Sequence, residues 1–207
     1  MENFKAAIEQ DNNTICAYIY GSRVYGSHHK DSDFDFITIV KDKTVHSPLL
    51  EFGDVTAYTV DEFQKLVNEH EISVLECIFL KDEFKLKEDH KFNFELNKST
   101  LRNSISSKAS NSWVKCKKKF IVEQDFNPYI GKKSAWHSLR IFDFGTQIAT
   151  QGKIVDYGSM NAILPDIMQL NSWSEIDGAF RKFHNETASK FKAVAPKEEM
   201  LTPKKIM

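Results

Sequence analysis

Hydrophobic and polar residues along the first ninety positions follow a pattern that predicts a small sheet with helices. Apolar residues at helical spacing predict a helix over 2–10, and acidic residues in a first turn predict another from Asp61 to about Glu69. The apolar run 72–80 is compatible with a helix or a strand, and 22–27 with a turn or a helix start. Runs rich in β-branched and aromatic residues predict strands at 14–20, 34–40 and 54–60.

From Lys91 onward the periodicity is helical. The expected fold class is therefore α+β, with a small mixed β-sheet lobe followed by a helical lobe. We expect the lobes to cover residues 1–90 and 91–195, and the polar stretch 196–207, which contains Pro203, to form a tail. The helices of the second lobe are expected at 92–107, 111–124, 132–151 and 174–192.

Composition narrows the class of protein. The chain has 207 residues, 41% of them hydrophobic and 28% charged, which is typical of a globular protein. No apolar run reaches the roughly 18 residues of a membrane helix, and the first ten residues lack the layout of a signal peptide. We therefore expect a cytoplasmic protein without a membrane partner. The three cysteines, Cys16, Cys77 and Cys116, are odd in number and widely spaced, so we expect reduced core residues.

The net charge of −1 hides an uneven distribution. Residues 1–90 hold 18 acidic and 9 basic side chains, whereas residues 91–207 hold 11 acidic and 19 basic. A metal-binding lobe beside a phosphate-binding lobe would have this distribution, and so would two lobes that simply attract each other.

Three aspartates, Asp31, Asp33 and Asp35, gather just before a predicted buried strand. Alternate residues of a strand share a face, so Asp33 and Asp35 point one way, about 6 to 7 Å apart at the usual rise per residue. Such a pair can hold one or two hard divalent cations, and Mg²⁺ suits it best. A solvated edge strand is the alternative. An EF-hand loop is set aside, because Phe36 and Asp42 stand where it needs glycine and glutamate.

A glycine and a serine precede these aspartates. If the first strand ends at Tyr20, Gly21 lets the backbone approach a ligand closely, and Ser22 with the following amides can bind a triphosphate.

Basic residues in the second lobe form two groups. Lys133, His137, Arg140 and Phe144 fall on one stripe of the helix expected at 132–151, where the first three could bind the phosphates of a nucleotide. Alternatively, the stripe faces water and His137 packs beside Trp136. The other group could bind a nucleic-acid backbone or form only a solvated helix face; it consists of Lys115, Lys117, Lys118 and Lys119.

Two further features are expected to be less informative. His28 and His29 lie in the loop before the aspartates, and we expect them to be exposed to solvent. Glu76 lies in an apolar segment, and we expect a structural role in which it pairs with a base of the helical lobe.

The spacing Gly21-Ser22, ten residues, then Asp33-Phe34-Asp35-Phe36 resembles the signature of the DNA polymerase beta-like nucleotidyltransferase superfamily. The resemblance implies a third metal-binding carboxylate on a following strand. Asp54, which heads DVTAYTV, matches best, and Glu51 is the fallback. Taken alone, Asp54 would instead be read as closing the turn made by Gly53.

Further segments resemble the branch associated with RNA repair. They are DVTAYTVDEFQKLV, VLECIF and KKSAWHSLRIFDFGTQIATQGKI, so that the resemblance touches residues 18 to 153. Phe36-Ile37-Thr38 stands where many members have Arg-Gly, which leaves the acceptor open.

The resemblance implies a Mg²⁺-dependent nucleotidyltransferase, with Mn²⁺ as the alternative ion. Asp33 and Asp35 would hold two ions, and Asp54 would hold the ion that activates the acceptor hydroxyl. Gly21 and Ser22 would seat a nucleoside triphosphate, helped by Arg23 or Lys133, and the favoured acceptor is an RNA 3′ end. One alternative is transfer to a protein side chain or a small molecule. Another is a non-catalytic nucleotide-binding or antitoxin-like partner protein.

Overall fold

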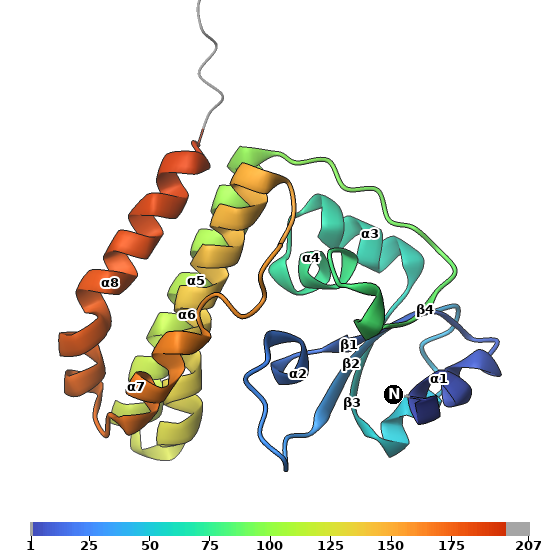
Figure 1. Ribbon diagram of the computed structural model, residues 1–207, viewed down its shortest axis with the longest axis horizontal. Helices are drawn as coiled ribbons and strands as arrows, with labels where there is room; N and C mark the ends of the chain where they lie inside the picture. The colour runs from blue at the N-terminus through green and yellow to red at the C-terminus, as the bar shows by residue number, and fades with distance from the viewer. Residues whose placement is uncertain (1, 198–207) are drawn as a thin grey trace, which may run out of the picture. The chain divides into compact units, whose positions relative to one another are not determined.

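The structure is a computed structural model that describes residues 2–197, and the chain divides into two compact units (Figure 1). Within the described residues, the first unit runs to Glu95 and also includes Lys153–Pro165. The second unit consists of Leu96–Gly152 and, among the described residues, 166–197. Residues 198–207 of the predicted tail lie outside the described residues. The division of the chain into a catalytic and a helical lobe at residue 90 stays a prediction.

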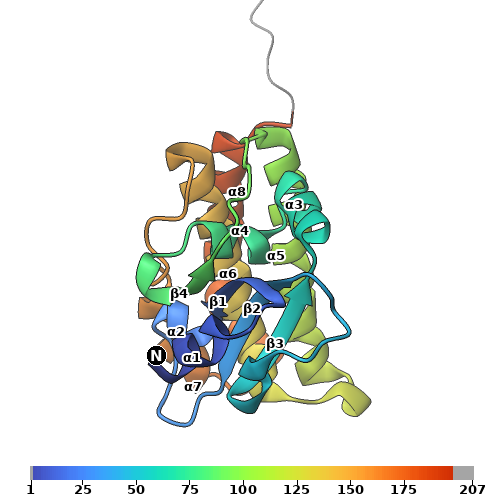
Figure 2. The same cartoon turned by 90° about the vertical axis from the view of Figure 1, so that its right-hand side faces the viewer.

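A four-stranded sheet in the order β3-β2-β1-β4 forms the centre of the first unit, and Figure 2 shows β1, β2 and β3 side by side. β1 pairs antiparallel with β2 and with β4, whereas β2 and β3 are parallel. The sheet is therefore mixed, and with the helices it confirms the predicted α+β fold class. The strands are β1 (Thr14–Tyr20), β2 (Phe34–Val40), β3 (Gly53–Tyr58) and β4 (Lys85–Glu88).

An aromatic cluster covers one face of the sheet. Helix α1 (Glu2–Glu9) contributes Phe4, whose ring centroid lies 4.7 Å from that of Phe34 and 5.3 Å from that of Phe36. Phe52, which follows the 3₁₀ helix Pro48–Glu51, closes the cluster at 5.1 Å from Phe4. Edge-on contacts of this kind add to the free energy gained by burying the rings, so this face of β2 is fixed by packing.

Helices α3 (Val60–Asn68) and α4 (Ile72–Ile78) belong to the opposite face. Phe63 of α3 is fully buried, with its ring 6.4 Å from Tyr18 on β1 and 5.9 Å from Tyr58 on β3. Tyr18 pairs with Ile37 and Tyr58 pairs with Ile39, so α3 covers the face of β2 that carries its odd-numbered residues. The apolar run 72–80, for which the sequence allows a helix or a strand, forms the helix α4 over Ile72–Ile78.

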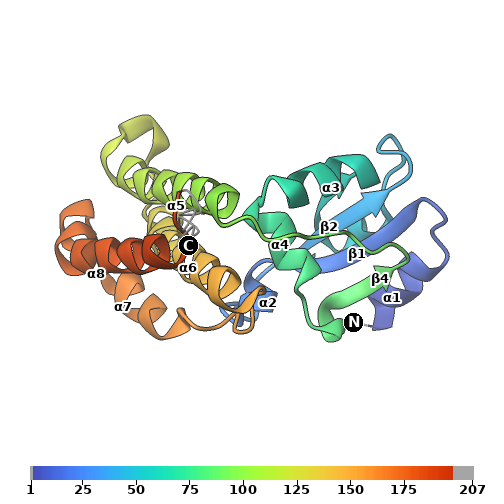
Figure 3. The same cartoon turned by 90° about the horizontal axis from the view of Figure 1, so that it is seen from above.

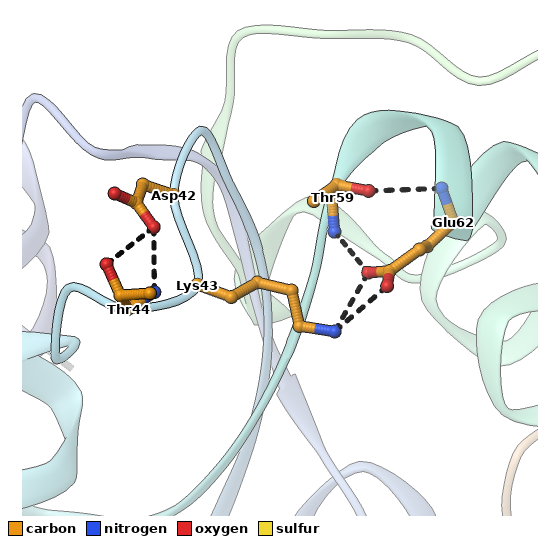
Figure 4. Close-up of polar contacts among 5 residues, drawn as sticks. All are labelled: Asp42, Lys43, Thr44, Thr59 and Glu62. Carbon is orange, nitrogen blue, oxygen red and sulfur yellow. Dashed lines mark hydrogen bonds and ion pairs between the residues drawn. The ribbon is translucent and has the colours of Figure 1, made fainter.

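The first turn of α3 is fixed by a capping box, which Figure 4 shows. The Thr59 hydroxyl accepts a hydrogen bond from the Glu62 amide, and the Glu62 carboxylate accepts one from the Thr59 amide. Lys43, from the loop after β2, forms an ion pair with Glu62 at 3.0 Å. The Thr59 amide and Lys43 lower the pKa of Glu62. The strand predicted over 54–60 therefore ends earlier, at Tyr58, because these reciprocal bonds start the helix at Val60.

The segment after β4 is extended, and the prediction of a helix over 92–107 is wrong for residues 92–97. The Gln64 side chain of α3 bonds both backbone groups of Asn93, at 2.8 and 3.0 Å, as a neighbouring strand would. The Phe92 ring contacts that of Phe63 at a centroid distance of 4.4 Å, and the Phe94 ring contacts that of Phe79 at 5.3 Å. These alternate anchors favour an extended backbone over a helix.

Three long helices form the second unit, as Figure 3 shows from above. They are α5 (Lys98–Ile121), α6 (Pro128–Gln151) and α8 (Trp173–Val194), with the short α7 (Leu164–Gln169) before α8. Gly145 lets the helices approach closely, since a Cβ there would lie 2.8 Å from Ile105 of α5 and from Phe191 of α8. The helices predicted over 92–107 and 111–124 are parts of one helix, and the break expected between them is wrong, because the serine-rich stretch there continues α5.

Two expectations about class can be compared with the described residues. Cys16, Cys77 and Cys116 are free and buried, which confirms that they are unpaired core residues. None of the helices between residues 2 and 197 combines the length and the apolar character that crossing a membrane requires.

Candidate functional site

The corner after β1 depends on an unusual backbone conformation at Gly21. This residue has φ 78° and ψ −147°, a combination that glycine adopts almost alone. The amides of Val24 and Tyr25 bond its carbonyl at 3.0 and 3.2 Å and close the single turn of α2 (Ser22–Tyr25). A Cβ at position 21 would lie 2.3 Å from Oδ2 of Asp35. The corner and the aspartate are therefore in direct contact.

Two of the predicted aspartates lie side by side on adjacent strands. In the parallel ladder between β2 and β3, Asp35 pairs with Asp54, and across β1 Asp35 pairs with Tyr20. Paired residues share a face, so the carboxylates of Asp35 and Asp54 belong to the same side of the sheet. Asp35 is half-buried and Asp54 is exposed. The two strands are neighbours, as a third carboxylate on a following strand would require.

Asp33 directly precedes β2 and is exposed. Strand alternation places it on the face of Asp35, two residues away. Over the described part of the chain, no group of three or more His, Cys, Asp or Glu side chains is arranged to hold a metal ion. Carboxylate oxygens are nevertheless the ligands that Mg²⁺ prefers, so the paired Asp35 and Asp54 fit a hard divalent cation. Glu51, the predicted substitute, ends the 3₁₀ helix before β3 and is exposed.

The loop that leads to the aspartates is held by Arg23. Its Nη2 donates a hydrogen bond to the Ser32 carbonyl at 2.6 Å, and its Cζ lies 3.7 Å from the centroid of the Phe34 ring. Arg23 therefore fixes the residues on both sides of Asp33. Its predicted role in binding a substrate stays a prediction. His28 and His29 in this loop are exposed, as expected.

A buried hydrogen-bond network, which the sequence did not indicate, holds the helix α2 that follows the Gly21 corner. The Tyr25 hydroxyl donates a hydrogen bond to Oε2 of Glu76 at 2.5 Å, and the Tyr157 hydroxyl donates one to the Glu76 carbonyl at 2.6 Å. The side chain of Asn161 bonds the Tyr25 carbonyl at 2.7 Å. Glu76 is only 1% exposed. The network connects α2 to α4 and to the segment 153–165, which lies far away in the sequence.

Of these residues, only Glu76 carried a sequence signal, as a carboxylate inside an apolar run. Its pairing with a base of the second unit stays a prediction, and the contacts described above give it a structural role. Tyr157 lies in a turn and Asn161 begins the short 3₁₀ helix Asn161–Ile163, so nothing in their spacing pointed to the corner.

The predicted basic stripe lies on α6, in the second unit. Nη2 of Arg140 donates to Nδ1 of His137 at 2.9 Å, and the guanidinium lies 5.4 Å from the Trp136 ring centroid and 4.9 Å from that of Phe144. Arg140 is buried, whereas Lys133 and His137 are partly exposed. The stripe therefore does not simply face water. Its predicted role toward a nucleotide stays a prediction.

The contact with Arg140 fixes the protonation of His137. A guanidinium can only donate, so Nδ1 must accept, and the ring is neutral with its proton on Nε2. Burial, followed by the charges of Arg140 and Lys133, lowers the pKa of His137 well below its usual value. The hydrogen bond and the lowered pKa thus both indicate a neutral His137 ring.

Residues 2–108, about half of the chain, match the model of a protein family described as "Polymerase beta, Nucleotidyltransferase". The match covers the sheet, the corner at Gly21 and all three aspartates. No curated protein sequence matches the chain.

Replacing Gly21 by alanine tests the corner. We expect Gly21→Ala to lower the free energy of unfolding by about 2 to 3 kcal/mol, because alanine is strained at this φ and ψ and its Cβ meets Asp35. Gly26→Ala is the matched control, since Gly26 has φ 71° and ψ 19° but only an ordinary contact at 3.5 Å. It should cost about 1 kcal/mol. Urea denaturation measures both, and equal losses would contradict the close contact.

The state of His137 can be measured by NMR titration of its ring. We expect the ring to remain neutral at pH 6, and Arg140→Gln to raise its pKa, whereas Arg181→Gln elsewhere in the unit should not. Because the folded pKa is lowered, this group stabilises the fold above about pH 6.5, and that contribution is lost as the pH falls below it. Burial lowers the pKa of His70 and His184 in the same direction. A charged His137 ring at pH 6 would contradict the assignment.

Proposed function

The chain belongs to the polymerase beta nucleotidyltransferase family, and from this premise we propose that it moves a nucleoside monophosphate from a nucleoside triphosphate to an acceptor hydroxyl. Family membership supports nucleotidyl transfer in general. The observation that carries the proposal for this chain is the pairing of Asp35 with Asp54 beside Gly21. A carboxylate pair next to a backbone corner that allows close approach suits a triphosphate bound with a cation.

In this proposal Asp33 and Asp35 would hold two divalent cations, Mg²⁺ or Mn²⁺, and Asp54 would help to hold the ion that activates the acceptor hydroxyl. When bound, such an ion neutralises phosphate charge and lowers the pKa of a bound hydroxyl. The fit rests on carboxylate chemistry and on the shared face of the two strands. Catalysis is assigned to the sheet lobe, within residues 1–90.

The chain's own groups would bind and orient the triphosphate. The Gly21 backbone admits the phosphates, the Ser22 hydroxyl can donate to them, and Arg23 keeps the loop before Asp33 in place. The acceptor oxygen would bond to the α-phosphorus as the bond to the leaving pyrophosphate breaks, and the hydroxyl proton would pass to solvent. Lys133, His137 and Arg140 are proposed as donors toward the phosphates.

The favoured acceptor is an RNA 3′ end. Support comes from the basic balance of residues 91–207, which hold 19 basic and 11 acidic side chains, since phosphate neutralisation gives affinity for any nucleic-acid backbone. A protein side chain or a small molecule is the alternative acceptor.

Removing single carboxylates tests the chemistry. We expect Asp33→Ala, Asp35→Ala and Asp54→Ala each to reduce pyrophosphate release by at least about 100-fold, because each would remove a ligand of the cation. Labelled nucleoside triphosphates with Mg²⁺ provide the assay, and chelation should abolish the signal. Asp61→Asn, an exposed carboxylate in the first turn of α3, is the control and should retain activity. If the wild type releases no more pyrophosphate than the variants, the protein is a non-catalytic nucleotide-binding partner.

Fractionation of the labelled product identifies the acceptor. The protein is incubated with labelled triphosphates and a cell extract, and RNA, protein and small molecules are then separated. We expect label at RNA 3′ ends with the wild type and none with Asp35→Ala. Label confined to protein or to small molecules would eliminate RNA as the acceptor and leave nucleotidyl transfer intact.

A further inference from the structure

The turn between α5 and α6 displays large apolar side chains to solvent. Phe126 is 61% exposed, Ile121 57%, Val114 50% and Tyr129 48%, whereas other large apolar side chains of α5 and α6, such as Trp113 and Trp136, are buried. The turn is the yellow-green end of the helical hairpin in Figure 3. The hairpin tip is defined here as these exposed residues and the neighbouring lysines: Val114, Lys117, Lys118, Ile121, Phe126 and Tyr129.

On α5 the tip residues occupy one face of the helix. Positions 114, 117, 118 and 121 follow the spacing i, i+3, i+4, i+7, which brings them onto a single stripe. All four are exposed, while Trp113 and Cys116 on the other side are buried. The two lysines therefore lie between two apolar residues on one surface.

The turn itself is ordered by hydrogen bonds. The Asn127 amide bonds the Lys119 carbonyl at 2.9 Å, and the Asn127 side chain caps α6 by accepting from the Ile130 amide at 3.0 Å. Lys119 also forms an ion pair with Asp125. Phe126 and Tyr129 stand on either side of this cap, so the two rings are presented on a fixed backbone and lose little further entropy on binding.

The charge around the rings is positive. Residues 114–133 contain six lysines and two acidic residues, and one of those acids, Asp125, is already paired. Exposed aromatic rings attract bases by stacking, and neighbouring lysines attract phosphates, which together are the groups that single-stranded nucleic acids offer. A surface for an apolar protein partner would instead be poor in lysine.

We propose that the hairpin tip binds single-stranded nucleic acid, with bases stacked on Phe126 and Tyr129 and phosphates held by Lys117 and Lys118. The biological role of this binding rests on the proposed function, since the bound strand would be the RNA acceptor. The binding itself depends on no catalytic residue.

The test measures binding of the full-length protein, without nucleoside triphosphate, to a fluorescent 12-nucleotide single-stranded RNA of mixed sequence. We expect Phe126→Ala and Tyr129→Ala each to weaken binding by about fivefold or more, and Phe126→Trp to retain it. Lys117→Gln and Lys118→Gln should each reduce the slope of log affinity against log salt by about 0.7. The paired control, Lys182→Gln with Lys190→Gln on the exposed face of α8, should change affinity little.

Several outcomes would overturn the proposal: no binding of the single strand, equal binding of a duplex of the same sequence, or an equal effect of the control lysines. Circular dichroism of each variant separates loss of binding from loss of folding. Asp35→Ala should bind the strand as the wild type does. A protein that binds RNA normally but releases no pyrophosphate would refute the proposed function alone. One that transfers nucleotides to another acceptor without binding RNA would refute the tip and the RNA acceptor, and would leave nucleotidyl transfer intact.

Discussion

In the parallel ladder between β2 and β3, Asp35 and Asp54 occupy the same rung. A shift of one residue in this register would place Gly53 or Val55 opposite Asp35 and turn the partner side chain to the other face of the sheet. The aromatic cluster resists such a shift, because Phe52, which directly precedes β3, contacts Phe4, and Phe4 packs on Phe34 and Phe36 of β2. Packing on one side of β2 thus fixes the position of the carboxylates on the other.

The site is also constrained from the end of β1. Gly21 permits the Asp35 carboxylate to lie against the backbone, and Tyr25, one turn later, is held by the buried carboxylate of Glu76. A buried carboxylate without partners would destabilise the fold, so the bonds to Glu76 and the position of α2 support each other. The proposed triphosphate corner therefore needs the segment 153–165, since Tyr157 and Asn161 complete the network.

Local patterns identified the elements that carry strong periodicity. β1 and β2 have the predicted bounds, and the run of aspartates, the glycine corner and the neighbouring β3 were all predictable because strand alternation and turn chemistry act over a few residues. β4 was missed because its four residues, KLKE, form a short charged edge strand without an apolar pattern. The extended segment around Asn93 and the continuous α5 depend on tertiary contacts, with Gln64 in one case and the helical core in the other, which no local window contains.

The chemistry available to the second unit follows from the bond between Arg140 and His137. Nδ1 of the histidine accepts from the guanidinium, so it cannot take a proton, and Nε2 already carries one. Neither nitrogen of His137 can therefore act as a general base while this bond persists. The stripe of Lys133, His137 and Arg140 presents donors and positive charge, and its role toward phosphates stays a proposal. In the proposed reaction the acceptor proton therefore passes to solvent and not to His137.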